Sequence, residues 1–309
     1  MVKCLVTKLN GSSNNNTLPV IGKLRIKFDG VKNNNGTNLS NLQISGIKNI
    51  VWKGEGTFNS FHNDGSYYYG MSTANKGIMY VDKYAVSLIN TSYTVGANVL
   101  FDDLNKYCSN LKSLIVSNSS QEGNISDIQD IALTSFVCEY SKIQGDIEEL
   151  KGSYSSLESF NISHSKVTSI LSSLKKYYNV KYINIAYSNS YGNLSDLQSL
   201  LSLERLYTNE SGITGDLSSL ASMPKLHTFE NWNISNTWTR DSLRDASYPI
   251  IGGIYKFSTA TDTDNFLKNM AKCAVGNNKT IRIMNSDKTS EANSAISTLQ
   301  SKGYTLAFE

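Results

Sequence analysis

Histidine, cysteine and acidic side chains are the residues of this 309-residue chain that could do chemistry, and their spacing decides whether they can act together. The histidines His62, His164 and His227 are far apart, and no neighbouring serine or cysteine has the context of an activated nucleophile. Asp262 and Asp264 in TDTDN resemble the start of a calcium loop, but the glycine and the distant glutamate of that motif are missing. We therefore expect helix capping at this position and no catalytic residues in the chain.

The other motifs also argue against cofactors. Neither common glycine-rich phosphate-binding motif occurs, and Cys4, Cys108, Cys138 and Cys273 lack metal-ligand spacing. No basic run with interleaved aromatic residues favours nucleic-acid binding, and no stretch approaches the ~18 apolar residues of a membrane span. The sequence predicts a protein that is not an enzyme, holds no metal or cofactor, binds no nucleic acid and does not insert into a membrane.

From about Phe101 to Asp241 the sequence repeats itself every 22 to 24 residues. Each unit begins with an apolar residue, and further apolar residues follow three and five positions later in an LxxLxL pattern. The first column contains Leu111, Leu133, Leu157, Val180, Leu203 and Leu226. One unit of this length cannot bury its apolar residues alone, so successive units must stack. The pattern predicts six short parallel strands alternating with five turns.

Two polar columns follow each predicted strand. A serine column lies eight positions after the first apolar residue, at Ser119, Ser141, Ser165, Ser188 and Ser211, and a glycine column lies four positions later, at Gly123, Gly145, Gly192 and Gly215. Glycine permits a sharp bend, and the Asn or Asp after it can cap a short helical turn. We expect the serines to form a structural ladder by bonding backbone groups of neighbouring units.

This pattern resembles the leucine-rich repeat family, with GDI or GDL turns and with serine where better-known subfamilies place asparagine in the ladder. The resemblance covers a little under half of the chain. It implies an α+β fold of the repeat-solenoid class, built on a parallel β-sheet.

The flanking segments predict two further domains. Lysine and arginine alternate with Leu24, Ile26 and Phe28, which indicates a strand with one buried face in an N-terminal all-β domain over residues 1–94, sandwich-like or a barrel. Residues 95–240 form the repeats. Residues 241–309 read as strand, helix, strand, helix, strand, a βαβαβ cap that continues the solenoid and keeps its end soluble.

Aromatic residues occupy the positions that we expect to face outward from the strands, on the concave face of the solenoid. The candidate binding residues are Tyr140, His164, Tyr187, Tyr182, Tyr207 and Trp232, interleaved with Asn161, Asn184 and Glu210. Amphipathic aromatics among hydrogen-bonding groups are typical of protein interfaces, and the same mixture suits glycans. The alternative is that tyrosine, with 18 copies, is common here and suits exposed strands.

The repeats and the opening MVKCLVTKLNG, followed by LPVIGKLRIKF, are similar to repeat proteins of gut Bacteroidales and of the crAss-like tailed phages that infect them. This resemblance implies a virion component, such as a head fibre, tail fibre or decoration protein, assembled in the host cytoplasm. Its N-terminal domain would attach to other virion proteins while the repeats face a host-surface protein or glycan.

Two alternatives stay open for the function: a bacterial cell-surface adhesin or cytoplasmic scaffold, and, as a third class, a repeat-bearing enzyme. The first residues do not have the pattern of a secretory signal, which assembly of a virion protein in the host cytoplasm would explain. A homotrimer is also open, since a sheet edge or the N-terminal domain could support it.

Overall fold

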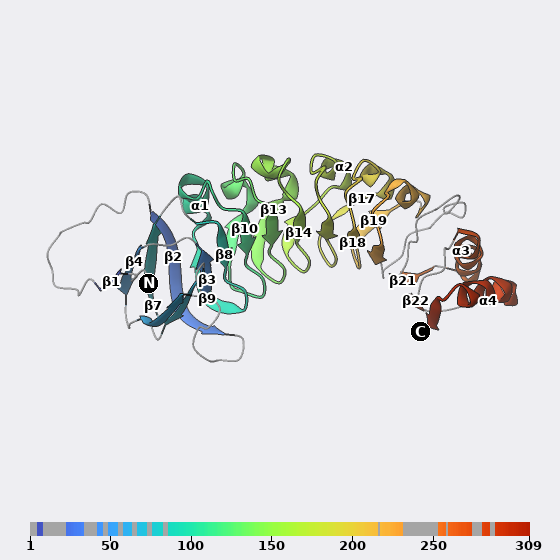
Figure 1. The fold of residues 1–309 in the computed structure, drawn as a ribbon, viewed down its shortest axis with the longest axis horizontal. Coiled ribbons are helices and arrows are strands. Elements are labelled where there is room, and N and C mark those ends of the chain that lie inside the picture. Colours follow the sequence, from blue (N-terminus) through green and yellow to red (C-terminus); the bar gives the residue numbers. More distant parts are fainter. Residues whose placement is uncertain are drawn as a thin grey trace. The chain divides into compact units, whose positions relative to one another are not determined.

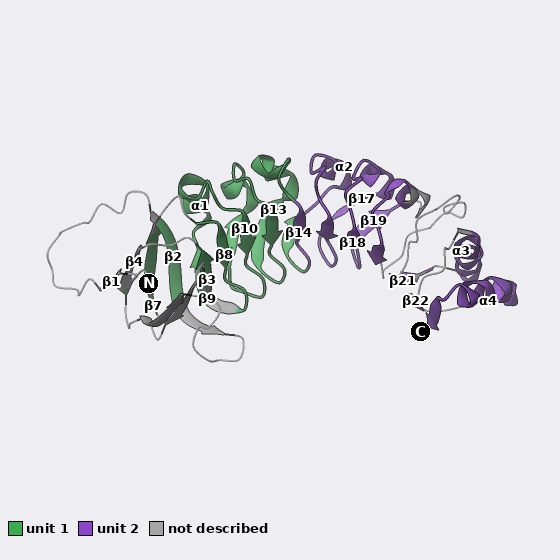
Figure 2. Cartoon of the chain, in the orientation of Figure 1, with its two compact units in different colours: residues 1–157, 164–167 green, residues 158–163, 168–309 purple. Residues whose placement is uncertain are grey.

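The computed structural model describes residues 5–8, 23–33, 42–45, 49–54, 58–63, 67–72, 76–82, 86–215, 217–230, 253–257, 259–273, 280–284 and 288–309. The chain divides into two compact units (Figure 2). Unit 1 contains residues 1–157 and 164–167, and unit 2 contains residues 158–163 and 168–309. The division falls inside the repeats, so each unit contains repeats and one flanking segment.

The N-terminal part of unit 1 is built from strands (Figure 1). They are β1 Leu5–Lys8, β2 Lys23–Asn33, β3 Leu42–Ser45, β4 Asn49–Gly54, β5 Phe58–Asn63, β6 Tyr67–Ser72, β7 Lys76–Asp82, β8 Leu88–Asn90 and β9 Thr94–Val99. Five form a sheet in the order β1-β4-β7-β2-β9, in which β1 and β4 pair in parallel and the other pairs are antiparallel. On β2, Leu24, Ile26 and Phe28 are buried and Lys27 is exposed, which confirms the predicted alternation.

The first repeat strands of unit 1 are β10 Ser113–Ile115 and β12 Ser135–Val137, and they pair in parallel. Strand β8 pairs in parallel with β10 and antiparallel with β3, which gives the order β12-β10-β8-β3-β6-β5. Val86, Ile89 and Thr91 are fully buried and keep the repeat spacing of three and five. The parallel stack therefore begins one unit earlier than the sequence predicted, because Thr91 hides the third apolar column.

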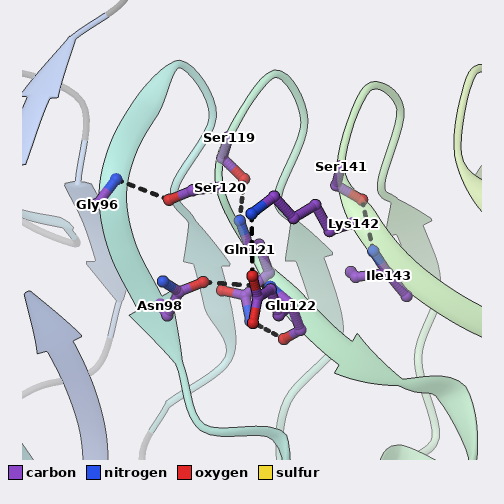
Figure 3. Close-up of polar contacts among 9 residues, drawn as sticks. All are labelled: Gly96, Asn98, Ser119, Ser120, Gln121, Glu122, Ser141, Lys142 and Ile143. Carbon is purple, nitrogen blue, oxygen red and sulfur yellow. Dashed lines mark hydrogen bonds and ion pairs between the residues drawn. The ribbon is translucent and has the colours of Figure 1, made fainter. Parts of the chain in front are cut away.

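The edge of β9 is covered by the turn that follows β10 (Figure 3). The fully buried Gln121 side chain accepts from the Val99 N–H at 2.8 Å and donates to the Val99 carbonyl at 2.8 Å. Beside it, the Gly96 N–H donates to Ser120 Oγ and the Glu122 N–H donates to Asn98 Oδ1. Side chains thus satisfy backbone groups that a neighbouring strand would otherwise pair.

In unit 2 the repeat strands are β14 Ser159–Asn161, β16 Tyr182–Asn184, β18 Arg205–Tyr207 and β20 Thr228–Glu230, all paired in parallel register. The predicted apolar columns are buried in both units, with Leu111, Leu133, Leu157, Val180 and Leu203 fully inaccessible and Leu226 3% exposed. The repeat solenoid is therefore assembled from these short parallel strands.

Short strands and helical turns complete each repeat. The strands are β11 Glu122–Asn124, β13 Lys142–Asp146, β15 Lys166–Thr168, β17 Tyr191–Asn193 and β19 Gly212–Thr214. The helical elements are α1 Phe101–Tyr107, η1 Ile125–Ile128, η2 Ile147–Glu149, η3 Lys151–Ser153, α2 Leu171–Leu174, η4 Leu194–Leu197 and η5 Leu217–Ser222. Asn124, Asp146 and Asn193 each form a capping box, as predicted from the residue after the glycine.

The glycine column is required for space as well as for backbone conformation. Gly145 has φ +110°, and a Cβ there would lie 2.7 Å from Asn124 Oδ1, the cap of the preceding turn. Gly215 has φ +119° and would meet Asn193 Oδ1 at 2.5 Å. A larger residue would displace the cap.

The C-terminal segment of unit 2 contains β21 Gly253–Lys256, α3 Ala260–Cys273, β22 Thr280–Met284, η6 Ser290–Ala292, α4 Asn293–Ser301 and β23 Thr305–Phe308. The three strands form a parallel sheet in the order β21-β22-β23. Tyr255 on β21 packs against Phe229 on β20, with ring centroids 6.3 Å apart. The role of this segment as a cap of the solenoid stays a prediction.

Candidate interaction surface

The residue seven positions after the first apolar position has a left-handed backbone in every described repeat. The six residues are Tyr93 (φ 61°), Asn118 (49°), Tyr140 (49°), His164 (51°), Tyr187 (54°) and Glu210 (51°), and they are all the non-glycine residues with positive φ in the described chain. We call them the left-handed column. Each repeat strand ends three residues before its member of the column, so all six residues lie in the turns that follow the strands.

This placement corrects one prediction. Tyr140, His164, Tyr187 and Glu210 were expected at outward strand positions, and the structure puts them in the turn instead. The physical reason is that a left-handed residue reverses the chain and cannot continue a strand. Trp232 lies outside the described residues.

Aromatic residues are an unfavourable choice for this backbone conformation. The left-handed region costs about 1–2 kcal/mol for an ordinary L-residue, and glycine, asparagine and aspartate are the residues that visit it routinely. Three of the six positions are nevertheless tyrosine, and Tyr93, Tyr140 and Tyr187 are 49%, 53% and 38% exposed. The fold alone does not call for large exposed rings at strained positions.

In unit 1, two members of the column touch. The Tyr140 ring stacks on the imidazole of His164, with centroids 4.1 Å apart and planes 12° from parallel. Burial lowers the pKa of His164, and the nearby Glu139 carboxylate partly offsets this by raising it. The lowered pKa keeps the imidazole in its neutral form at neutral pH.

In unit 2, two of the predicted binding residues, Tyr182 and Tyr207, lie on the outward side of their strands, as expected. Tyr182 on β16 and Tyr207 on β18 occupy diagonal positions, and their rings are 5.6 Å apart and inclined by 45°. Burial raises the pKa of Tyr207, and the neighbouring Glu230 raises it further. Glu230 itself is half-buried, and that burial raises its pKa against a hydrogen bond from Asn209 and the charge of Arg282.

Asn161 and Asn184, two of the candidate binding residues, form hydrogen bonds that stabilise the same turns. Asn161 Oδ1 accepts hydrogen bonds from the N–H and Oγ of Ser163, and Asn184 Oδ1 accepts from the Ala186 N–H. These bonds close the turn that leads into the left-handed residue. The two asparagines therefore position the column.

The serine column also acts locally, which differs from the predicted ladder between units. Ser119, Ser141, Ser188 and Ser211 donate to the carbonyls of Val116, Cys138, Ile185 and Thr208 in their own unit. The Val167 N–H likewise donates to Ser165 Oγ. A serine side chain readily reaches the carbonyl three residues earlier, and Ser165 also meets the preceding unit, because Cys138 Sγ donates to Ser165 Oγ at 3.9 Å.

The residues considered for catalysis do not converge. Within the described part of the chain, no group of three or more His, Cys, Asp or Glu side chains is placed to hold a metal ion. Burial raises the pKa of Cys108 and Cys138 to about 12, so both thiols stay protonated at neutral pH. Thr259 caps α3 through Asp262, and Asp264 accepts from Thr289. The described helices include none that is long and apolar enough to cross a membrane.

No family model and no curated protein matches this sequence. Three solved structures with similar folds are the plant peptide hormone receptor RGFR1 in complex with RGF2, a leucine-rich-repeat protein of Leptospira interrogans, and the ectodomain of the Arabidopsis receptor kinase HAESA in complex with a peptide hormone ligand. Their identities are 12%, 9% and 16%, with TM-scores of 0.45, 0.38 and 0.40.

The aligned regions cover 73%, 67% and 69% of this chain, and 40%, 68% and 39% of the three solved chains. The chain thus spans well under two thirds of the two plant receptors. The architecture is assigned from the chain's own strand register and buried columns. On those grounds, the chain folds as a repeat solenoid of the leucine-rich-repeat type.

Proposed function

We propose that this chain is a non-enzymatic binding protein whose protein partner contacts the aromatic side chains of the left-handed column. The observation that supports this is the choice of Tyr93, Tyr140 and Tyr187 at positions where asparagine or glycine would be less strained. Exposed aromatic rings contribute large contact areas with little loss of side-chain entropy, which makes them common anchors of protein interfaces.

The finer proposal is that the chain is a virion component of a tailed phage, a head or tail fibre or a decoration protein. It rests on the resemblance to repeat proteins of gut Bacteroidales and crAss-like phages. On this proposal the protein is assembled in the host cytoplasm and located in the virion, where residues 1–94 attach to other virion proteins and the repeats contact a host-surface protein or glycan. A bacterial cell-surface adhesin is the alternative.

The column is tested by removing exposed rings without adding strain. The double variant Tyr140→Asn, Tyr187→Asn keeps a residue that tolerates the left-handed backbone. The control Tyr191→Asn removes a ring that is equally exposed, 52% against 53% for Tyr140, but lies outside the column. Partners cross-linked in the producing cells are identified and quantified by mass spectrometry for each variant.

We expect at least a tenfold loss of the cross-linked partner with the double variant and no loss with the control. Equal recovery from all three proteins would rule out the column as the binding surface. The virion proposal is tested separately by mass spectrometry of purified virions, where absence of the chain would remove it and leave the binding proposal intact.

A further inference from the structure

We propose a second interaction surface in unit 2, an apolar stripe that binds an acidic amphipathic helix of another protein. The stripe consists of Tyr178, Leu201 and Pro224, one residue from each of three successive repeats. These residues precede their strands, whereas the left-handed column follows the strands, so the two surfaces are independent.

The three residues occupy the same position of the same turn. The N–H groups of Val180, Leu203 and Leu226 donate to the carbonyls of Tyr177, Leu200 and Met223, at 3.0, 3.0 and 3.2 Å. Each stripe residue is thus the first central residue of a β-turn that ends at the first apolar column. Because β16, β18 and β20 pair in register, the turns recur at the strand spacing of about 4.8 Å.

The turn itself does not need apolar side chains at this position. Tyr177, Leu200 and Met223, which come just before, are fully buried and supply the core contact. The next residue points to solvent, and Tyr178 and Leu201 are 55% and 56% exposed. The first central position of a common β-turn accepts most residue types, and only proline is favoured there.

The three repeats that begin at Leu111, Leu133 and Leu157 differ at the matching position. They have the exposed polar residues Ser109 and Ser155, and Ile131, which is 2% exposed. The exposed apolar stripe is therefore a feature of unit 2 and not a general property of the repeat. A contiguous exposed apolar patch on an otherwise polar surface marks an interaction site.

Charge indicates the kind of partner. Lys175, Lys176, Lys181 and Lys225 lie within three residues of the stripe in sequence, and Glu204 is the one acidic residue in the same windows. Glu158 is paired with Lys181 at 2.7 Å. Four cations against two carboxylates leave a positive surplus, which favours a partner with acidic residues beside its apolar ones.

An amphipathic helix fits this stripe better than a lipid surface does. Side chains one turn apart on a helix are about 5–6 Å apart, close to the spacing of successive stripe residues. The four lysines only reach the lower end of the clusters of four to eight basic residues typical of lipid-binding segments, and two carboxylates offset half of their charge.

The probe is a fluorescein-labelled 18-residue helical peptide with leucine on one face and glutamate on the other, together with a counterpart that has lysine for glutamate. Binding to the full-length protein is followed by fluorescence anisotropy at 50 and 500 mM salt. We expect the acidic peptide to bind at least tenfold more tightly than the basic one, and more weakly at high salt.

The variants separate the two parts of the surface. Tyr178→Ser with Leu201→Ser, and independently Lys175→Glu with Lys225→Glu, should each weaken binding at least tenfold. Tyr191→Ser on β17, with 52% exposure in the same unit, is the matched control and should not change it. The lysine variant keeps the test decisive if the serine variant unfolds, because both lysines are exposed.

Equal binding of both peptides, no binding of the acidic peptide, or unchanged binding by the folded variants would overturn the proposal. Binding of phosphatidylglycerol vesicles in place of the acidic peptide would also overturn it and reassign the stripe to a membrane surface. None of these results bears on the left-handed column, so the two proposals fail separately.

Discussion

The Tyr140 ring lies flat on the His164 imidazole, 4.1 Å from centroid to centroid, although the two residues are 24 positions apart in sequence. Both have left-handed backbones in matching turns of successive repeats. The stack follows from the repeat: a period of 22 to 24 residues brings each turn beside the next one, and exposed rings at matching positions then meet.

Burial of His164 in the stack makes stability depend on pH. The pKa of His164 is lowered in the folded state from its ordinary 6.5, chiefly by burial. The unfolded chain therefore binds a proton first as pH falls, and stability is lost from about pH 6.5 down to the lower folded pKa. Urea midpoints between pH 8 and 5 should fall for the native chain. His164→Phe keeps an aromatic ring and should flatten this dependence; an unchanged profile would show that other groups cause it.

Strain in the left-handed column should be measurable as stability. Tyr93→Asn places a residue that tolerates φ 61° where an exposed tyrosine now stands, and we expect a gain of about 0.5–1 kcal/mol in the free energy of unfolding. Tyr178→Asn, at an exposed turn position outside the column, should change it by less than about 0.5 kcal/mol. Destabilisation by Tyr93→Asn would mean that the ring contributes more to the fold than its backbone costs.

The Gln121 side chain should be essential for stability at the edge of β9, which the turn after β10 covers. Replacing it with leucine removes both hydrogen bonds to Val99 and leaves a buried N–H and carbonyl unpaired, at a cost of about 2–3 kcal/mol. Gln144→Leu is the control because Gln144 is exposed. Hydrogen exchange of the Val99 amide reports the same event locally and should accelerate in the first variant. Unchanged exchange would contradict the role assigned to Gln121.

One buried carboxylate ties α1 to β2. Asp103, 6% exposed at its side chain, accepts from Arg25 Nε at 2.7 Å, from Nη2 at 2.9 Å and from the Arg25 N–H at 3.0 Å, and these contacts raise the pKa of the guanidinium. Asp103→Asn should cost about 2–3 kcal/mol in urea unfolding. Glu122→Gln breaks the exposed pair with Lys142 and should cost under about 1 kcal/mol. Equal effects would mean that burial of the Arg25 pair adds nothing.

The repeat columns could be predicted from the sequence because a buried position restricts which residue types can occupy it. Leu114 and Phe136 must be apolar to fill the space between stacked strands, and Gly145 must lack a side chain to leave room for the cap of the neighbouring turn. The capping role of Asn124 and Asp146 could be predicted for the same reason, since a short helical turn leaves unpaired N–H groups.

The residue at which each repeat strand ends could not be predicted in this way. Tyr140 and Tyr187 are residue types that favour strands, and nothing in their type announces a left-handed turn that usually prefers asparagine or glycine. The recurrence of φ near +50° shows that tertiary packing overrides local preference there. The place of β8 in the parallel repeat stack was missed because Thr91 is polar, although its position is buried by the strands on either side.

The sequence by itself determined the period, the buried columns and the glycine turns, because each depends on contacts that recur in every unit and so select one kind of residue. The tertiary structure alone decided which exposed rings share a surface and which buried polar side chain pairs with the edge of β9. Tyr140 meets His164, and Gln121 reaches Val99, through stacking between units and not through any local signal. Surface residues are under no common packing constraint, so their neighbours are set by the register of the stacked strands.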